Sequence, residues 1–192
     1  ISLRALPLLL LLGTAPLVGC GPKDGGTENV MNEDGTVNPR AAFSAGVSIL
    51  QTPDKKTGEI DYQTAYDMFS QAAEAQPDFI NAHYNAGWTA EAMGMDDRAA
   101  NHYRQAYELD SNNKEFLFAY AELLAASGDG AGAVNLYQGY VENNPTDLTV
   151  RNSLMEALTE AGRYDDAIAE AREILIQDAK NVSAYRNLSR IY

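Results

Sequence analysis

Apolar residues recur at helical spacing along most of this chain. From Ala99, apolar side chains return at Tyr103, Ala106 and Tyr107, which places them on one face of a helix. Glycines and short polar stretches interrupt the pattern at regular intervals, as at Gly94. The pattern predicts an all-α chain with helices within 38–51, 62–77, 80–94, 95–113, 114–128, 129–145, 148–162, 163–179 and 182–192.

The predicted helices repeat with a fixed period. Small residues return every 34 positions at Ala65, Ala99, Ala133 and Ala167. The same step relates three helix-ending glycines and three aromatic residues: Gly94, Gly128 and Gly162, and Phe69, Tyr103 and Tyr137. Several positions that share one period indicate a solenoid of stacked helix pairs.

A helix–turn–helix unit of this period, with small residues in fixed slots, resembles the tetratricopeptide repeat. The resemblance implies a helical solenoid over residues 39–192. Its first unit departs from the pattern, because the step from Gly46 to Ala65 is longer than the matching step from Gly87 to Ala99. The turn of that unit, at 52–61, therefore carries about seven extra residues, and insertions in repeat proteins lie in such loops. The units are expected at about 39–79, 80–113, 114–147 and 148–181, with a partial unit at 182–192.

The first residues follow different rules. Arg4 precedes a short apolar run, and "LVGC" at 17–20 resembles the lipobox of bacterial lipoproteins. We therefore expect a signal peptide over 1–19, a lipid on Cys20 and a flexible tether over 20–38. Because Gly21 follows the cysteine, the resemblance implies an anchor in the outer membrane. The first residue is not Met and the last unit is partial, so we expect the chain to be a fragment at both ends.

Composition and motifs exclude several classes of function. The formal net charge of −13 opposes nucleic-acid binding, which needs a basic footprint. We find no phosphate-binding loop, no nucleophile with an adjacent base and no cofactor motif. A calcium pattern fails at 52–61, and His83 and His102 lack metal-ligand spacing, so both are expected to be ordinary polar helix residues. The sequence therefore predicts a protein without enzymatic activity, metal, cofactor or small-molecule substrate.

A protein-binding surface remains. In tetratricopeptide repeat proteins the first helix of each unit lines a concave groove, and the resemblance transfers that role to slots in this chain. We expect Tyr84, Trp88 and Phe118 to form the centre of a partner-binding patch, with packing in the core as the alternative. The other residues that the resemblance places in the groove are Glu91, Glu122, Asn152, Glu156, Arg186 and Arg190.

The resemblance implies a lipid-anchored scaffold that binds protein partners in the periplasm. The chain is most similar to the tetratricopeptide repeat lipoproteins of gliding motility, and pilus assembly is a second setting for such a scaffold. Two alternatives stay open. One is an assembly factor or chaperone for outer-membrane protein clients, and the other is an accessory subunit of an envelope enzyme.

Overall fold

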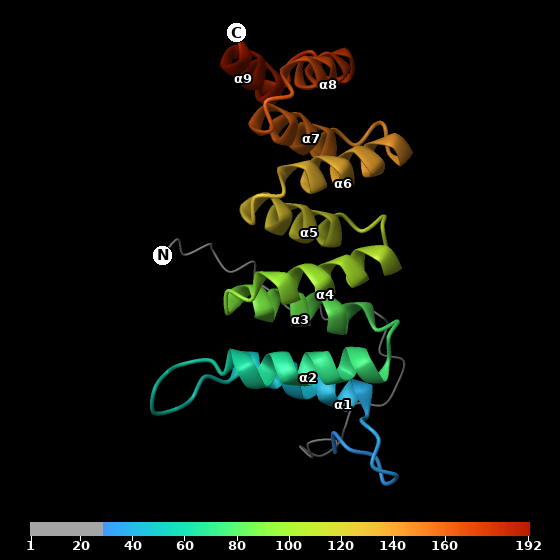
Figure 1. Ribbon diagram of the computed structural model, residues 1–192, viewed down its shortest axis with the longest axis vertical. Helices are drawn as coiled ribbons and strands as arrows, with labels where there is room; N and C mark the ends of the chain where they lie inside the picture. The colour runs from blue at the N-terminus through green and yellow to red at the C-terminus, as the bar shows by residue number, and fades with distance from the viewer. Residues whose placement is uncertain (1–28) are drawn as a thin grey trace. The chain divides into compact units, whose positions relative to one another are not determined.

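A computed structural model describes residues 29–192 of the chain. Within these residues the fold is all-α, as predicted, and the only β pairing is an isolated bridge between Met31 and Val37. The described part contains nine helices (Figure 1). They are α1 (Pro39–Gln51), α2 (Tyr62–Ala75), α3 (Ile80–Ala92), α4 (Asp96–Leu109), α5 (Lys114–Ala126), α6 (Gly130–Asn143), α7 (Leu148–Glu160), α8 (Tyr164–Gln177) and α9 (Val182–Ile191).

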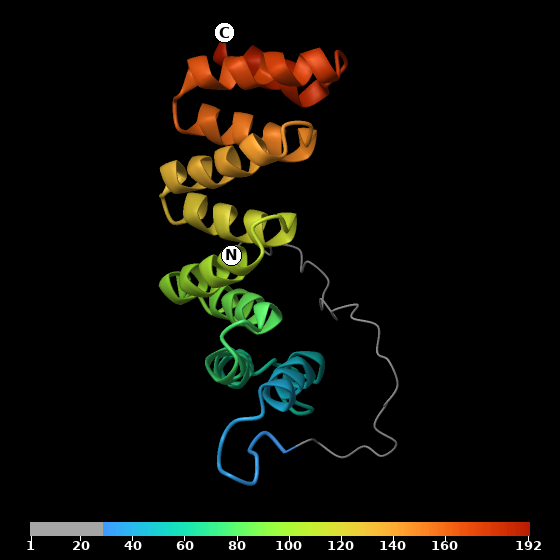
Figure 2. The same ribbon diagram turned by 90° about the vertical axis from the view of Figure 1, so that its right-hand side faces the viewer.

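The contacts divide the chain into two compact units. Unit 1 ends at Ala106, within α4, and unit 2 runs from Tyr107 to Tyr192. In each unit consecutive helices form antiparallel pairs, as α1 and α2 do in unit 1 and α5 and α6 do in unit 2 (Figures 1 and 2). The pairs present their small and apolar faces to each other, and this burial is the main driving force of the fold.

The helix-ending glycines explain why the pairs turn so sharply. Gly94, Gly128 and Gly162 have positive φ angles of 72°, 92° and 73°. Only glycine adopts this left-handed conformation without a steric cost from Cβ. The residue after each glycine donates its N–H to a carbonyl in the last turn of the helix, as Asp129 does to Leu124 at 2.8 Å.

Two other glycines allow close packing between paired helices. A Cβ built on Gly87 of α3 would lie 2.6 Å from a ring carbon of Tyr103 on α4. A Cβ on Gly46 of α1 would lie 2.7 Å from the ring of Phe69 on α2. The sequence therefore places glycine where the backbone of one helix meets an aromatic ring of its partner helix.

The extra residues of the first unit form an ordered loop. Residues 52–61 join α1 to α2, whereas much shorter turns join the later pairs, as 127–129 do between α5 and α6. Asp54 stabilises the loop, because its carboxylate accepts the backbone N–H groups of Lys56 and Thr57, both at 2.8 Å. Gly58 closes the turn with a φ of 73° and donates its N–H to the Asp54 carbonyl.

Residues 30–38, which belong to the stretch expected to be a flexible tether, form a hydrogen-bonded turn. Asn38 donates its N–H to the Val30 carbonyl at 2.8 Å, and Asn32 donates to Thr36 at the same distance. Val30 and Val37 pack against a buried alanine cluster of unit 1. The segment is mostly polar, but these two valines bury apolar surface. The segment therefore packs against the first helix pair.

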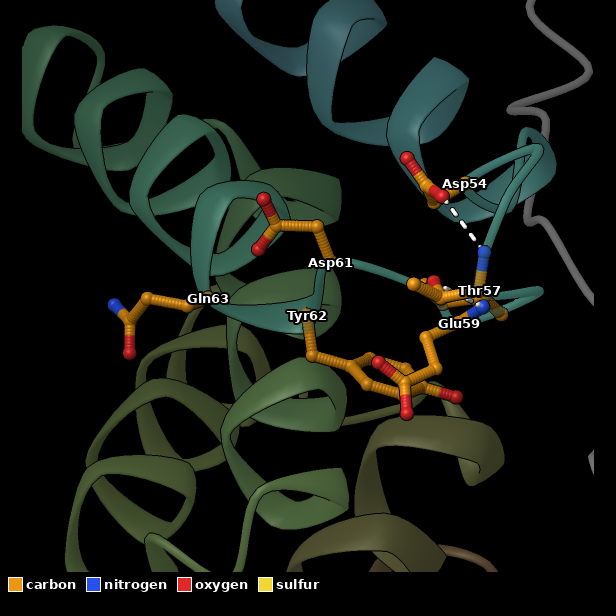
Figure 3. A pocket seen from close by; sticks show the side chains of 7 residues that line it. Asp54, Thr57, Glu59, Asp61, Tyr62 and Gln63 are labelled. Carbon is orange, nitrogen blue, oxygen red and sulfur yellow. Dashed lines mark hydrogen bonds between the residues drawn. The ribbon is translucent and has the colours of Figure 1, made fainter.

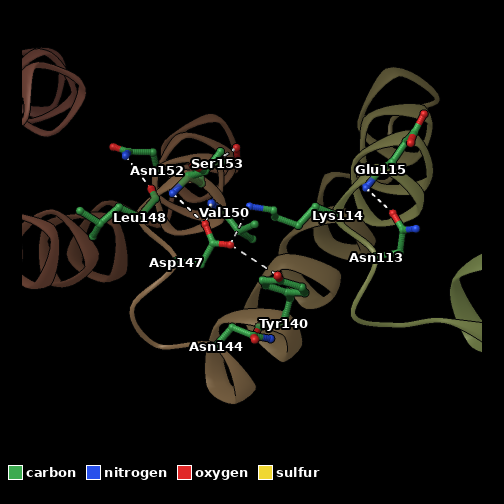
Figure 4. Close-up of polar contacts among 11 residues, drawn as sticks. Asn113, Lys114, Glu115, Tyr140, Asn144, Asp147, Leu148, Val150, Asn152 and Ser153 are labelled. Carbon is green, nitrogen blue, oxygen red and sulfur yellow. Dashed lines mark hydrogen bonds and ion pairs between the residues drawn. The ribbon is translucent and has the colours of Figure 1, made fainter. Parts of the chain in front are cut away.

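Unit 2 has a continuous apolar core, which spans α5 to α9 and includes Leu117, Tyr137, Leu154 and Ile174. Polar contacts fix the start of α7 beside it (Figure 4). Asp147 caps α7, pairs with Lys114 at 3.1 Å and accepts a hydrogen bond from Tyr140 at 3.4 Å. Because Lys114 begins α5, this contact ties the start of one helix pair to the start of the next.

Candidate functional site

Tyr84, Trp88 and Glu91 lie along α3 in unit 1, and all three are half-buried. The Trp88 ring is 6.1 Å from the ring of Tyr62, which begins α2 directly after the 52–61 loop. The Tyr84 ring is 5.7 Å from that of Tyr103, whose hydroxyl donates to Glu91 at 2.9 Å. We call Tyr62, Tyr84, Trp88, Glu91 and Tyr103 the unit 1 patch. It consists of two ring pairs, each partly open to solvent, and one carboxylate that accepts a hydrogen bond from a tyrosine.

Unit 2 repeats the second ring pair. Phe118 and Tyr137 stand one repeat after Tyr84 and Tyr103, and their rings are 5.8 Å apart. Phe118 is half-buried and Tyr137 is buried. The same two slots therefore hold an aromatic contact between paired helices in both units.

Carboxylates surround the unit 2 ring pair. Burial, and then the negative charges of Glu122, Glu156 and Glu160, raise the pKa of Tyr137 to about 12. Glu122 lies on α5 and the other two on α7, and all three are exposed. We call Phe118, Tyr137 and these three glutamates the unit 2 patch, which combines an aromatic surface with negative potential.

Asn152 lies near the start of α7 and is half-buried (Figure 4). Its amide donates to the Leu148 carbonyl at 2.6 Å, while its buried side-chain oxygen has no partner. Arg186 and Arg190 are exposed on α9. They are the only cations among the residues that sequence analysis placed in the groove.

The structure thus places the predicted residues in two groups. Tyr84, Trp88 and Glu91 belong to unit 1, and Phe118 belongs to unit 2 with the remaining groove residues. The three aromatic residues expected to form one patch are therefore assigned to separate units. The predicted lipidation site, Cys20, lies outside the described residues.

An open pocket of about 390 Å³ lies at the 52–61 loop (Figure 3). Asp54, Glu59, Asp61 and Tyr62 are among the residues that line it. Two of these carboxylates already have structural partners: Asp54 accepts loop N–H groups and Asp61 caps α2 by accepting from Thr64 at 2.9 Å. Hydrogen bonds from Thr57 and Lys56 lower the pKa of Asp54. Tyr62 connects the pocket to Trp88.

Sequence reasoning missed a contact between the two histidines. The rings of His83 on α3 and His102 on α4 are 5.7 Å apart, and their Nδ1 atoms are 3.5 Å apart. His83 is buried. A signal was present, because the matching positions two repeats later hold Arg151 and Glu170, a pair of opposite charges at the same separation. The repeat period therefore predicts contact between the two slots.

Within residues 29–192 no three metal-binding side chains converge. None of the helices in that range combines the length and apolar character needed to span a bilayer. Both patches consist of aromatic rings and carboxylates on helix faces, which are suited to holding a peptide or protein surface.

Known proteins match this architecture. The tetratricopeptide repeat family matches residues 90–158 and again 124–192, which together cover more than half of the chain. The Vi polysaccharide export protein VexE of Salmonella typhi is 31% identical over 96 residues, which is 48% of this chain. The match spans only 14% of the length of VexE.

Solved structures share the fold. A tetratricopeptide repeat protein from Parabacteroides merdae superposes with a TM-score of 0.64 at 18% identity, over 80% of this chain and 58% of its own. YrrB, described as a TPR protein with an unusual peptide-binding site, gives a TM-score of 0.59 at 18% identity, over 81% and 76%. A structure of MamA gives 0.56 at 17% identity, over 69% and 77%.

Proposed function

Because this chain belongs to the tetratricopeptide repeat family, whose folds bind peptides or proteins, we propose that it is a non-enzymatic scaffold that binds a basic segment of a protein partner. The observation that carries the proposal is the unit 2 patch. Phe118 offers a half-buried apolar ring beside Tyr137, and three exposed glutamates act on Tyr137 through their charge. Aromatic residues supply affinity at such sites, and charge supplies steering and specificity.

The cell envelope is the proposed setting. The lipobox-like "LVGC" supports a lipid anchor on Cys20, and the partial relative VexE is named for polysaccharide export. We extend the proposal to a scaffold anchored in the outer membrane and facing the periplasm, in a complex for export, motility or pilus assembly. An anchor of this kind holds the repeats near membrane partners, which raises their effective concentration.

The unit 2 patch is tested with two short fluorescent peptides. One is rich in Lys and Arg, and the other is the same peptide with Glu in place of each Lys and Arg. Binding of each peptide is measured by fluorescence anisotropy. We expect the basic peptide to bind and the acidic one to fail, with affinity that falls as the salt concentration is raised. Glu122→Gln with Glu156→Gln should weaken binding about tenfold. Glu142→Gln with Glu173→Gln, on exposed positions of the second helices, is the matched control.

Equal loss in both double variants would mean that net charge, and not the patch, governs binding. Tight binding of the acidic peptide would contradict the proposal directly.

The anchor is tested separately. Cys20→Ser should leave uncleaved precursor or release the protein from membranes, because the thioether requires a thiol. Membrane fractions are separated on a density gradient and probed for the protein, with Ser44→Ala on α1 as the control substitution. If the Cys20 variant still fractionates with the outer membrane, the anchor lies elsewhere.

A further inference from the structure

A chain of polar contacts links three helices of unit 1 through the two histidines. The His83 Nε2 lies 3.0 Å from the carbonyl oxygen of Pro77, in the segment that joins α2 to α3. The two Nδ1 atoms are 3.5 Å apart. The His102 Nε2 lies 3.4 Å from the hydroxyl of Tyr66 on α2.

The contacts assign the proton positions in the neutral pair. A carbonyl only accepts, so His83 donates from Nε2 and its Nδ1 is an acceptor. His102 must then donate from Nδ1, and its Nε2 accepts from Tyr66. Every nitrogen of the two neutral rings therefore has a suitable partner.

Protons disturb this arrangement. When His83 takes up one extra proton, the neutral His102 can move its own proton from Nδ1 to Nε2. Its Nδ1 then accepts a hydrogen bond from the Nδ1 of His83. With two, both Nδ1 atoms carry protons that point at each other, and the rings carry like charges. Two imidazolium ions at this distance inside a half-buried site repel strongly.

Among the described residues, no carboxylate contributes to the pKa shifts of the two histidines. Tyr66 on α2 and the Pro77 carbonyl are neutral, and the guanidinium of Arg98 on α4 lies 5.7 Å from the centre of the Tyr66 ring. A second cation does not stabilise an imidazolium. Burial lowers the pKa of His83 against the opposing effect of the Pro77 carbonyl. Burial, followed by the charge of His83, lowers the pKa of His102 to about 4.

The matching positions of the next two repeats do not hold two groups that repel each other when protonated. One repeat later they hold Leu117, fully buried, and Leu136, which packs against the same core. Two repeats later they hold the ion pair of Arg151 and Glu170. The fold therefore accepts an apolar pair or an ion pair at these slots. The histidine pair differs from both, because unfolding lets it take up protons at the ordinary histidine pKa of about 6.5.

We propose that the contact between His83 and His102 is an acid-sensitive latch, which holds α2 and the Pro77 segment against α3 and α4 at neutral pH and loosens them in acid. The latch adjoins the unit 1 patch, because Tyr62 on α2 touches Trp88 on α3 across the same pair of helices. Acid would then disturb the Tyr62–Trp88 contact. This effect on the helices does not depend on the proposed function.

The direction of the pH effect follows from linkage. The unfolded chain binds protons on histidine with an ordinary pKa of about 6.5, whereas the folded pair resists them. Stability from the pair is complete above about pH 6.5 and is lost as pH falls toward the lowered pKa values. Acid thus favours the loosened state within that window.

The experiment compares the full chain with a variant built from its own repeats. His83→Leu with His102→Leu copies the pair at Leu117 and Leu136. Melting midpoints are recorded at pH 7.0 and 5.0, together with the emission of Trp88, the single tryptophan of the chain. The midpoint of the natural chain should fall about 4 °C further than that of the variant, and only the natural chain should show a shift in Trp88 emission.

A second measurement needs no variant, so it tests the proposal even if the double-leucine variant fails to fold. The ring signals of both histidines are followed by NMR in the natural chain from pH 8 to 4. Depressed, mutually dependent titrations support the latch. Two independent titrations at the ordinary histidine pKa, or equal pH dependence of the natural and Leu-containing chains, overturn it.

Discussion

Arg151 occupies the slot of His83 two repeats later and makes the same bond. The Arg151 guanidinium donates to the Pro145 carbonyl at 3.0 Å, and His83 donates to the Pro77 carbonyl at 3.0 Å. Tyr185, one repeat further on, donates to the Ala179 carbonyl at 3.2 Å. In these three units a side-chain donor in the slot fixes the segment between repeats, and the spacing from acceptor to donor is the same each time. Leu117, which holds the slot in the unit between His83 and Arg151, has no such donor.

This relationship gives a prediction for Glu170, the ion-pair partner of Arg151. Glu170→Leu should lower the free energy of unfolding by about 2 kcal/mol, because it leaves the largely buried guanidinium without its counter-charge. Adding Arg151→Leu should recover most of the loss, since the double variant copies Leu117 and Leu136. It also removes the buried Arg151 Nε that has no partner. Urea unfolding measures both steps, and additive losses in the double variant would argue against a coupled pair.

Two glycines should respond to alanine in opposite directions. Gly128 has a φ of 92°, so Gly128→Ala should cost about 1 kcal/mol of stability. Gly139 lies inside α6, and an added Cβ there meets no atom within 4 Å, so Gly139→Ala should add about 0.5–1 kcal/mol. Chemical denaturation of the two variants checks both signs. A loss of stability at both positions would mean that an added Cβ at Gly139 meets a neighbouring atom, contrary to the structure.

The repeat period explains how much of the fold was predictable. Some glycines end helices, and other small residues lie where two paired helices pack closely. Both kinds recur at a fixed step along the sequence, so the period alone reveals them. The ring contact between Tyr62 and Trp88 could not be predicted, because the matching slots of the next two repeats hold no ring pair: they are Asp96 with Glu122 and Gly130 with Glu156. The packing of Val30 and Val37 was missed because two apolar residues in a polar stretch give no periodic signal.

The positions of the candidate site residues follow from the sequence more readily than their contacts do. The slots for Tyr84 and Phe118 follow from the period, and the structure adds their partners Tyr103 and Tyr137 on the paired helices. Sequence alone did not divide the chain at Ala106. That division depends on the density of contacts along the array, which a repeat pattern does not record.

Trp88 remains the residue with which to test whether the unit 1 patch binds a partner. It is half-buried, and one neighbouring ring, Tyr62, lies 6.1 Å away, so part of the indole is available for contact. An aromatic anchor that becomes buried on binding contributes about 2 kcal/mol or more. Trp88→Ala should therefore weaken capture of the partner at least tenfold.

Stability separates binding from packing at this position. A half-buried ring costs less to remove than a core aromatic, for which truncation costs about 3–5 kcal/mol, so we expect the melting midpoint of Trp88→Ala to fall by only a few degrees. Tyr164→Ala serves as the control, because Tyr164 is an exposed aromatic on α8 outside both patches. Binding is measured by titrating the purified partner against each variant, and in the natural chain Trp88 emission should shift to shorter wavelength as the partner covers it. A large loss of stability with unchanged affinity per folded molecule would show that Trp88 belongs to the core of the α2–α3 contact and that the partner binds another face.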